Sequence, residues 1–221
     1  MAAARADLRR RIRLAAEVIF VFYGLPLAYV LVWRSPFVFG LLWVAAGLAF
    51  WLLWRDFGFD RNALTRRSDM RRHLRAILVI YLPACVGSGI AVAWLIPDRL
   101  FALPMKRPGL WAAIVIFYPL LSVYPQELIW RGLFFRRYAT LFGSGRTMIM
   151  ASALAFAWVH VVMLNPVAVW LTLAGGVLFG YRYDRSRSLV VVSIEHALYG
   201  LLVFTIGLGV YFVQGIPPPI P

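Results

Sequence analysis

The sequence contains few acidic residues and almost no cysteine. Only nine of its 221 residues are Asp or Glu, and Cys85 is the single cysteine. One cysteine excludes an internal disulfide framework. The 23 Lys and Arg residues give a formal net charge of +14, a value also found in proteins that bind nucleic acid. However, these basic residues gather in a few segments between apolar runs, which is typical of cytoplasmic loops beside membrane spans.

Long polar segments are missing as well. Hydrophobic residues make up 62% of the chain, and the mean hydropathy is +0.78. A soluble domain would be closer to one half apolar. Several runs reach or approach the roughly 20 residues that cross a bilayer as a helix. The expected spans are residues 15–33, 36–54, 76–96, 110–138, 147–164, 166–181, 188–201 and 202–214.

These spans predict an all-α, polytopic membrane protein with about eight transmembrane helices in one bundle, the last two being separate or forming one bent helix. No internal repeat is apparent, so a single membrane domain is expected over residues 1–221. With a cytoplasmic N-terminus, eighteen basic residues fall inside and four outside, which follows the positive-inside rule. Heavy use of arginine and a single lysine, Lys106, indicate a bacterial inner (plasma) membrane.

A small set of ionisable residues falls within the expected spans. They are Glu127, Glu195, His160 and His196. Such groups are rare in membranes, and they usually face a polar cavity or one another. At a helical rise of about 1.5 Å per residue, Glu127, His160 and His196 would lie about 12–20 Å from the cytoplasmic ends of their helices. We therefore expect three separate helices to bring these side chains together at a similar depth.

A purely structural interpretation is also available for each of these residues. Arg131 follows Glu127 by one helical turn, so the two can form an i,i+4 ion pair that neutralises itself. His160 and His196 could each form a hydrogen bond between helices. Glu195 points about 100° away from His196 around the same helix. It is therefore expected to pair with an arginine from another helix or to lie at a polar seam.

Three short motifs appear in order along the second half of the chain. "QELIWRG" (126–132), "FAWVH" (156–160) and "HALYG" (196–200) lie on separate expected spans. They resemble the EExxxRG, FxxxH and HxxxN or HxxxD motifs of the CPBP family, the intramembrane glutamic proteases that include the type II CAAX prenyl proteases. The specific part of the resemblance covers residues 110–214, which we interpret as a CPBP/CAAX protease-like core.

The chain departs from the family pattern at two positions. Gln126 stands where the family has its first glutamate, and Gly200 stands where it usually has an amide or an acid. In the family, the first glutamate and the second-motif histidine are thought to activate water, whereas the third motif is thought to hold the oxyanion. Glutamine cannot accept a proton at neutral pH. Either Glu127 has taken over the role of the base, or the protein is catalytically silent.

The resemblance implies an intramembrane endopeptidase that cleaves membrane-anchored proteins or peptides within the lipid bilayer. It implies no cofactor and no metal, and the grouping of the basic residues between apolar runs argues against a nucleic-acid partner. In this hypothesis Glu127 activates water, His160 positions the water and carries the proton, and His196 stabilises the oxyanion. The supporting residues are Gln126 as an amide donor, Arg131 as the ion-pair partner and Tyr199 as a spare donor.

Three other functions fit some of these residues. A catalytically silent CPBP-fold scaffold or regulator would explain Gln126 and Gly200. A zinc-dependent membrane protease could use His160, His196 and Glu127 as ligands, although the sequence has no HExxH motif. A transporter with a proton relay would also need intramembrane charges, but the chain lacks the internal repeats typical of transporters.

Overall fold

The computed structural model describes residues 2–33 and 38–212, and all regular structure within these ranges is helical. The longer helices are α1 (Ala2–Val18), α3 (Val38–Arg55), α4 (Met70–Leu95), α6 (Pro108–Tyr118), α10 (Arg146–Val159), α11 (Pro166–Ser186) and α12 (Leu189–Thr205). The short α-helices are α2 (Leu25–Ala28), α5 (Ala102–Lys106), α7 (Tyr124–Glu127), α8 (Phe134–Arg137) and α9 (Ala139–Phe142). The remaining helical turns are of the 3-10 or π type.

Within the described residues, five helices are long and apolar enough to cross a membrane. They are Ala3–Val32, Val38–Arg55, Met70–Leu95, Pro108–Arg137 and Arg146–Met163. This confirms the prediction of an all-helical membrane protein, whereas the predicted count of eight spans is not confirmed. One reason is that α12 runs unbroken across the expected boundary at 201/202 and ends at Thr205. Only a 3-10 turn, Leu208–Phe212, follows it, and positions 213–214 lie outside the described residues.

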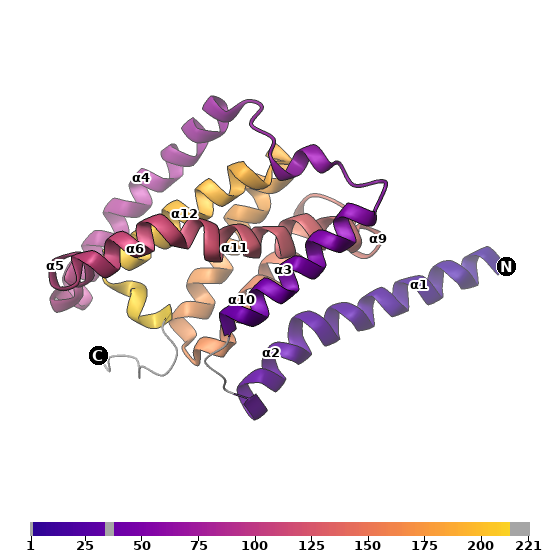
Figure 1. Cartoon of the computed structure of the whole chain (residues 1–221), viewed down its shortest axis with the longest axis horizontal. Coiled ribbons are helices and arrows are strands. Elements are labelled where there is room, and N and C mark those ends of the chain that lie inside the picture. The colour runs from indigo at the N-terminus through magenta and orange to yellow at the C-terminus, as the bar shows by residue number, and fades with distance from the viewer. Residues whose placement is uncertain (1, 34–37, 213–221) are drawn as a thin grey trace.

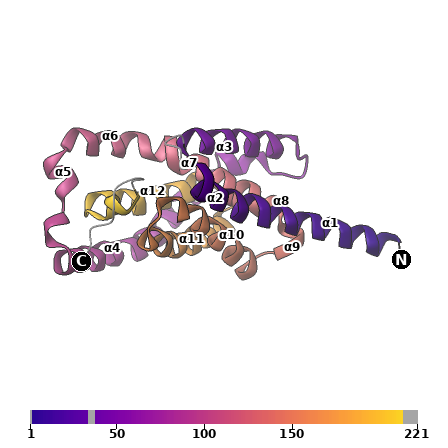
Figure 2. The same ribbon diagram turned by 90° about the horizontal axis from the view of Figure 1, so that it is seen from below.

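Helix α12 lies in the middle of the bundle. It contacts α11 and α4 on one side and the long helix that begins with α6 on the other; Figures 1 and 2 show this arrangement from two directions. The hydroxyl of Ser188 accepts a hydrogen bond from the backbone N–H of Val191 at 3.2 Å. This N-cap fixes where α12 begins. It thereby sets the position of His196, two turns further along.

Small residues bring α10 and α11 close together. A Cβ added at Gly176 would lie 3.0 Å from the Cα of Ala153, and one at Gly180 would lie 3.2 Å from a side-chain carbon of Ile149. Such small residues are typical of closely packed membrane helices. Aromatic side chains fill the neighbouring core. Among them are three buried residues of the long helix: Trp130, Phe134 and Phe135.

The long helix Pro108–Arg137 is widened at two places by π-helical turns, η5 (Pro119–Val123) and η6 (Leu128–Leu133). Each widened turn is held by a side chain from another helix. Trp43 Nε1 donates to the carbonyl of Leu121 at 3.1 Å, and Ser152 Oγ donates to the carbonyl of Trp130 at 2.8 Å. π-helical turns inside α-helices occur frequently at functional sites, and these two flank Glu127.

Candidate active site

Glu127 is the last residue of α7 and forms a buried ion pair with Arg131. The exposed fraction of both residues is 0%. Oε1 of Glu127 accepts from Arg131 Nη1 at 3.2 Å, and Oε2 lies 3.2 Å from Arg131 Nε. Arg131 Nη2 also donates to the carbonyl of Gly176 at 3.2 Å, and the guanidinium lies 4.5 Å from the ring centre of Phe156. The i,i+4 pair indicated by the sequence is present, and it connects the long helix to α10 and α11.

His196, on α12, contacts the same carboxylate. Its Nδ1 is 2.7 Å from Oε1 of Glu127. Because an ionised carboxylate can only accept, Nδ1 carries a proton and donates it in this hydrogen bond. In a neutral imidazole, Nε2 is then unprotonated and free to accept. The ring stacks on Phe179, with centroids 4.5 Å apart and an interplanar angle of 17°. Glu127 and Phe179 therefore fix both the tautomer and the orientation of His196.

His160 reaches the same region but does not join the pair. Its Nδ1 is 2.7 Å from the carbonyl oxygen of Phe156, so Nδ1 is the donor here as well. The ring of Phe156 packs edge-on against His160 at 4.9 Å and against His196 at 5.5 Å between centroids. Across residues 2–33 and 38–212, no hydrogen bond or ion pair links His160 to Glu127 or His196.

Two of the expected supporting residues make other contacts. Gln126 donates from Nε2 to the hydroxyl of Ser122 at 2.8 Å. Its Oε1 is buried without a hydrogen-bond partner in the described part of the chain, and so is the hydroxyl of Tyr199. The ring of Tyr199 packs edge-on against Tyr81 at 5.3 Å. Neither residue hydrogen-bonds to His196 among the residues described here.

Glu195 forms a separate buried pair with Arg182. Arg182 Nε and Nη2 donate to the two carboxylate oxygens at 2.9 and 3.1 Å, and the side chains are 4% and 1% exposed for Arg182 and Glu195. Glu195 thus pairs with an arginine from another helix, as the sequence indicates. The expected spans 166–181 and 188–201 leave Arg182 in a basic cytoplasmic loop. That assignment is wrong, because α11 continues to Ser186 and buries this residue.

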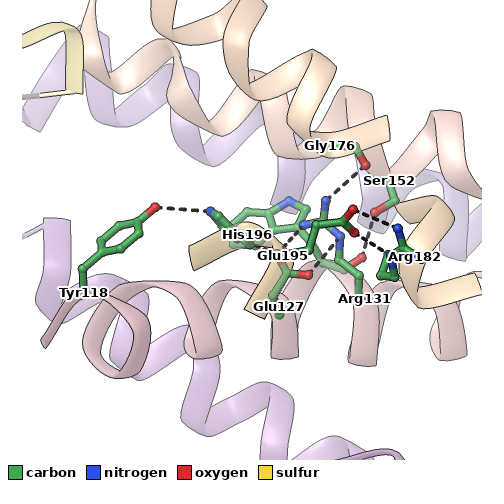
Figure 3. A network of polar contacts seen from close by, with 9 residues as sticks. Tyr118, Glu127, Arg131, Ser152, Gly176, Arg182, Glu195 and His196 are labelled. Atoms are coloured by element: carbon green, nitrogen blue, oxygen red, sulfur yellow. Dashed lines mark hydrogen bonds and ion pairs between the residues drawn. The ribbon is translucent and has the colours of Figure 1, made fainter. Parts of the chain in front are cut away.

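Tyr118, the last residue of α6, is a neighbour of His196 that sequence analysis missed. Its hydroxyl lies 3.4 Å from Nε2 of His196. Glu127 and Tyr118 therefore approach the imidazole at its two different nitrogens (Figure 3). The available signal was Gly200, since a residue without a side chain inside a helix can mark a close approach. A Cβ at that position would overlap the hydroxyl end of the Tyr118 ring.

The three candidate ligands of the zinc alternative do not form a metal set. Within the described ranges, no group of three His, Cys, Asp or Glu side chains is arranged to hold a metal ion. A catalytic zinc site needs all of its ligands directed at one point. Glu127 and His196 are instead bonded to each other, and the ring of Phe156 packs against both histidines.

Comparison with known proteins adds a family to this geometry. Residues 108–202, a little under half of the chain, match the family model described as type II CAAX prenyl endopeptidase Rce1-like. This range holds all three motifs and runs from α6 into α12. No curated protein and no solved structure matches the chain.

The matched region identifies an integral membrane protein of a protease family. The match over this region supports membership of the CPBP family of CAAX-protease-like proteins. A protease of this family implies a lipid bilayer environment and a membrane-anchored substrate.

Proposed function

We propose that this protein is a glutamic-type intramembrane endopeptidase in which Glu127 and His196 together activate the attacking water. The observation that carries the proposal is the 2.7 Å contact between Oε1 of Glu127 and Nδ1 of His196. A carboxylate bound to one imidazole nitrogen makes the other nitrogen a better base, because it stabilises the imidazolium that forms. This pair lies within the region that matches a family of membrane proteases.

The geometry supports a division of labour between the two residues. Oε1 of Glu127 contacts both Arg131 and His196, whereas Oε2 lies in ion-pair range of Arg131 but has no hydrogen-bond partner among the described residues; the side chain is fully buried. The sequence alone predicts that Glu127 contacts the water directly, but Nε2 of His196 is better placed to do so. Nε2 takes a proton from water, and the hydroxide adds to the peptide carbonyl carbon. The imidazolium then gives that proton to the amine nitrogen as the C–N bond breaks.

His160 retains the proposed role of positioning the water. Because its Nδ1 donates to the carbonyl of Phe156, its Nε2 is unprotonated in the neutral ring and can accept a hydrogen bond from water. The expected role of His196 as oxyanion donor is less well supported, since a nitrogen that must take a proton cannot donate one at the same time. An oxyanion donor is therefore needed from another residue.

The proposal also includes the finer features of the architecture. These are one membrane domain over residues 1–221, a protease core over 110–214, membrane-crossing segments at the expected ranges with 188–201 and 202–214 joined as one bent helix, and a cytoplasmic N-terminus in a bacterial inner membrane. The asymmetric distribution of arginine supports the orientation. The substrates would be membrane-anchored proteins or peptides that are cut near a helix end, at a site reached by water.

The test is a cleavage assay with purified protein in liposomes. The probes are single-pass membrane peptides that carry a fluorophore and a quencher on either side of the segment next to the helix end. We expect Glu127→Gln to lower kcat by roughly 10³–10⁴, because a neutral amide no longer stabilises the imidazolium or fixes its tautomer. Gln126→Ala should only weaken cleavage. Unchanged cleavage by Glu127→Gln would discard the mechanism.

A further inference from the structure

The hydroxyl of Tyr118 lies at the free nitrogen of the proposed base. The distance of 3.4 Å to Nε2 of His196 is long for a hydrogen bond, but such contacts often tighten only when substrate is bound. Tyr118 takes no part in the water activation described above. Its position beside the atom that receives the proton from water nevertheless calls for a physical explanation.

The surroundings of Tyr118 hold its ring firmly in this position. The ring packs edge-on against Phe204, with centroids 5.4 Å apart, and against His196 at 6.3 Å. Gly200 lies beside the hydroxyl end of the ring, and a Cβ at Gly200 would overlap the hydroxyl oxygen and two ring carbons of Tyr118. Glycine inside a helix costs about 0.5–1 kcal/mol relative to alanine. Position 200 therefore has a specific packing reason to lack a side chain.

The backbone of the long helix also contributes to this placement. In a regular α-helix, Tyr118 and Glu127 would point about 180° apart, because nine residues at 3.6 per turn make two and a half turns. The π-helical turn η5 (Pro119–Val123) lies between them. A π-helical turn has more residues per turn and therefore less rotation per residue. This change brings both side chains of one helix to the same imidazole, one at each nitrogen.

We propose that Tyr118 is a further catalytic residue, whose O–H donates a hydrogen bond to the oxyanion formed on the substrate carbonyl. The proposal rests on the proposed function and deepens it. Nε2 of His196 accepts a proton in the first step, so it cannot hold the oxyanion at that moment. A phenol keeps its O–H at neutral pH. A carbonyl attacked by a water bound to Nε2 lies within reach of this hydroxyl.

The proposal also explains the departure at Gly200. A side chain at this position, whether amide or acid, would occupy the space that the phenol fills. Tyr118 and Gly200 therefore form one unit in which the donor comes from α6 and the space for it comes from α12.

The test compares Tyr118→Phe with wild type in the liposome cleavage assay. This substitution removes one oxygen and keeps the ring packing. We therefore expect kcat to fall by about 10²–10³, the usual loss for one oxyanion donor, with KM and the apparent melting temperature unchanged. Tyr124→Phe is the matched control: its hydroxyl, on the same long helix, donates to the carbonyl of Leu64 at 3.1 Å. Its kcat should stay within about twofold of wild type, since one surface or backbone contact has only a small effect.

A second variant tests the space beside the Tyr118 ring rather than its hydroxyl group. Gly200→Ala keeps the phenol but forces its hydroxyl away from His196, so kcat should fall at least about tenfold, equivalent to one lost interaction. Full activity of Tyr118→Phe, in a preparation where Glu127→Gln is inactive, overturns the role of Tyr118 and leaves the endopeptidase proposal intact. Full activity of Glu127→Gln instead overturns the proposed function itself.

Discussion

Replacing Glu195 with glutamine removes the charge from a pair that is buried on both sides. Arg182 would keep one acceptor, but it would lose one of its two hydrogen bonds and the opposite charge. Removing one partner of a buried ion pair typically costs about 3–5 kcal/mol. Because the amide retains one bond, we expect the lower end, about 3 kcal/mol. At about 2–4 °C per kcal/mol for a chain of this size, the apparent melting temperature should fall by about 6–12 °C.

The assay is thermal unfolding in detergent, combined with cleavage measured per folded molecule. Glu195→Gln should unfold at a lower temperature. Below that temperature its kcat should stay within about threefold of wild type, because the side chain of Glu195 hydrogen-bonds to Arg182 and points about 100° away from that of His196 around α12. Asp184→Asn is the matched control. The pair of Asp184 with Arg187 is more exposed, so its loss should cost less than about 1 kcal/mol.

Two results would refute this reasoning. An unchanged melting temperature in Glu195→Gln would show that the pair with Arg182 does not hold α11 and α12 together. A loss of kcat as large as that of Glu127→Gln would show that Glu195 takes part in the chemistry. Either result would contradict the assignment of a structural role to Glu195 and a catalytic role to Glu127.

Two further substitutions test the neighbouring contacts. Gln126→Glu should lower cleavage or leave it unchanged, because the new carboxylate would be buried at a position whose side chain, among the described residues, hydrogen-bonds to the hydroxyl of Ser122 and not to an arginine. A rise of tenfold or more in kcat would show that the base belongs at position 126. Gly176→Val should lower the apparent stability by about 1–3 kcal/mol through overpacking against α10, and should also weaken the contact of Arg131 with the carbonyl of Gly176. An unaltered unfolding curve for this variant would contradict the close packing of α10 and α11.

The spacing of residues along a single helix predicted part of the candidate active site, because such spacing does not depend on how the helices pack against one another. The pairing of Glu127 with Arg131 follows from the i,i+4 rule, which holds wherever the chain is helical. The separation of Glu195 from His196 follows from the angle between adjacent helical residues. The partner of Glu195 was less predictable. Arg182 looks like part of a basic loop in the sequence, whereas α11 extends far enough to bury it.

Contacts between helices were harder to predict, since depth in a membrane does not determine rotation about the helix axis. His160 and His196 were expected at one site, but Phe156 packs against both rings and only His196 bonds to Glu127. Tyr118 was missed for a related reason. Regular helical spacing places it on the face opposite Glu127. Pro119 marks an interruption of the helix at this point, but the sequence does not show by how much the winding changes. The proposed roles of these residues remain predictions.

The two widened turns mean that the length of the long helix is constrained by more than the thickness of the bilayer. A plain membrane helix can gain or lose a residue and adapt by tilting. Here, a helix of the same length with ordinary winding through η5 would place Tyr118 on the face opposite Glu127. Trp43 donates to the carbonyl of Leu121 within this same turn. The angle between Tyr118 and Glu127 around this helix is therefore fixed by its winding. Evolution can alter that angle only by changing the helix together with Trp43, which supports the widened turn, and Gly200, which makes room for the phenol.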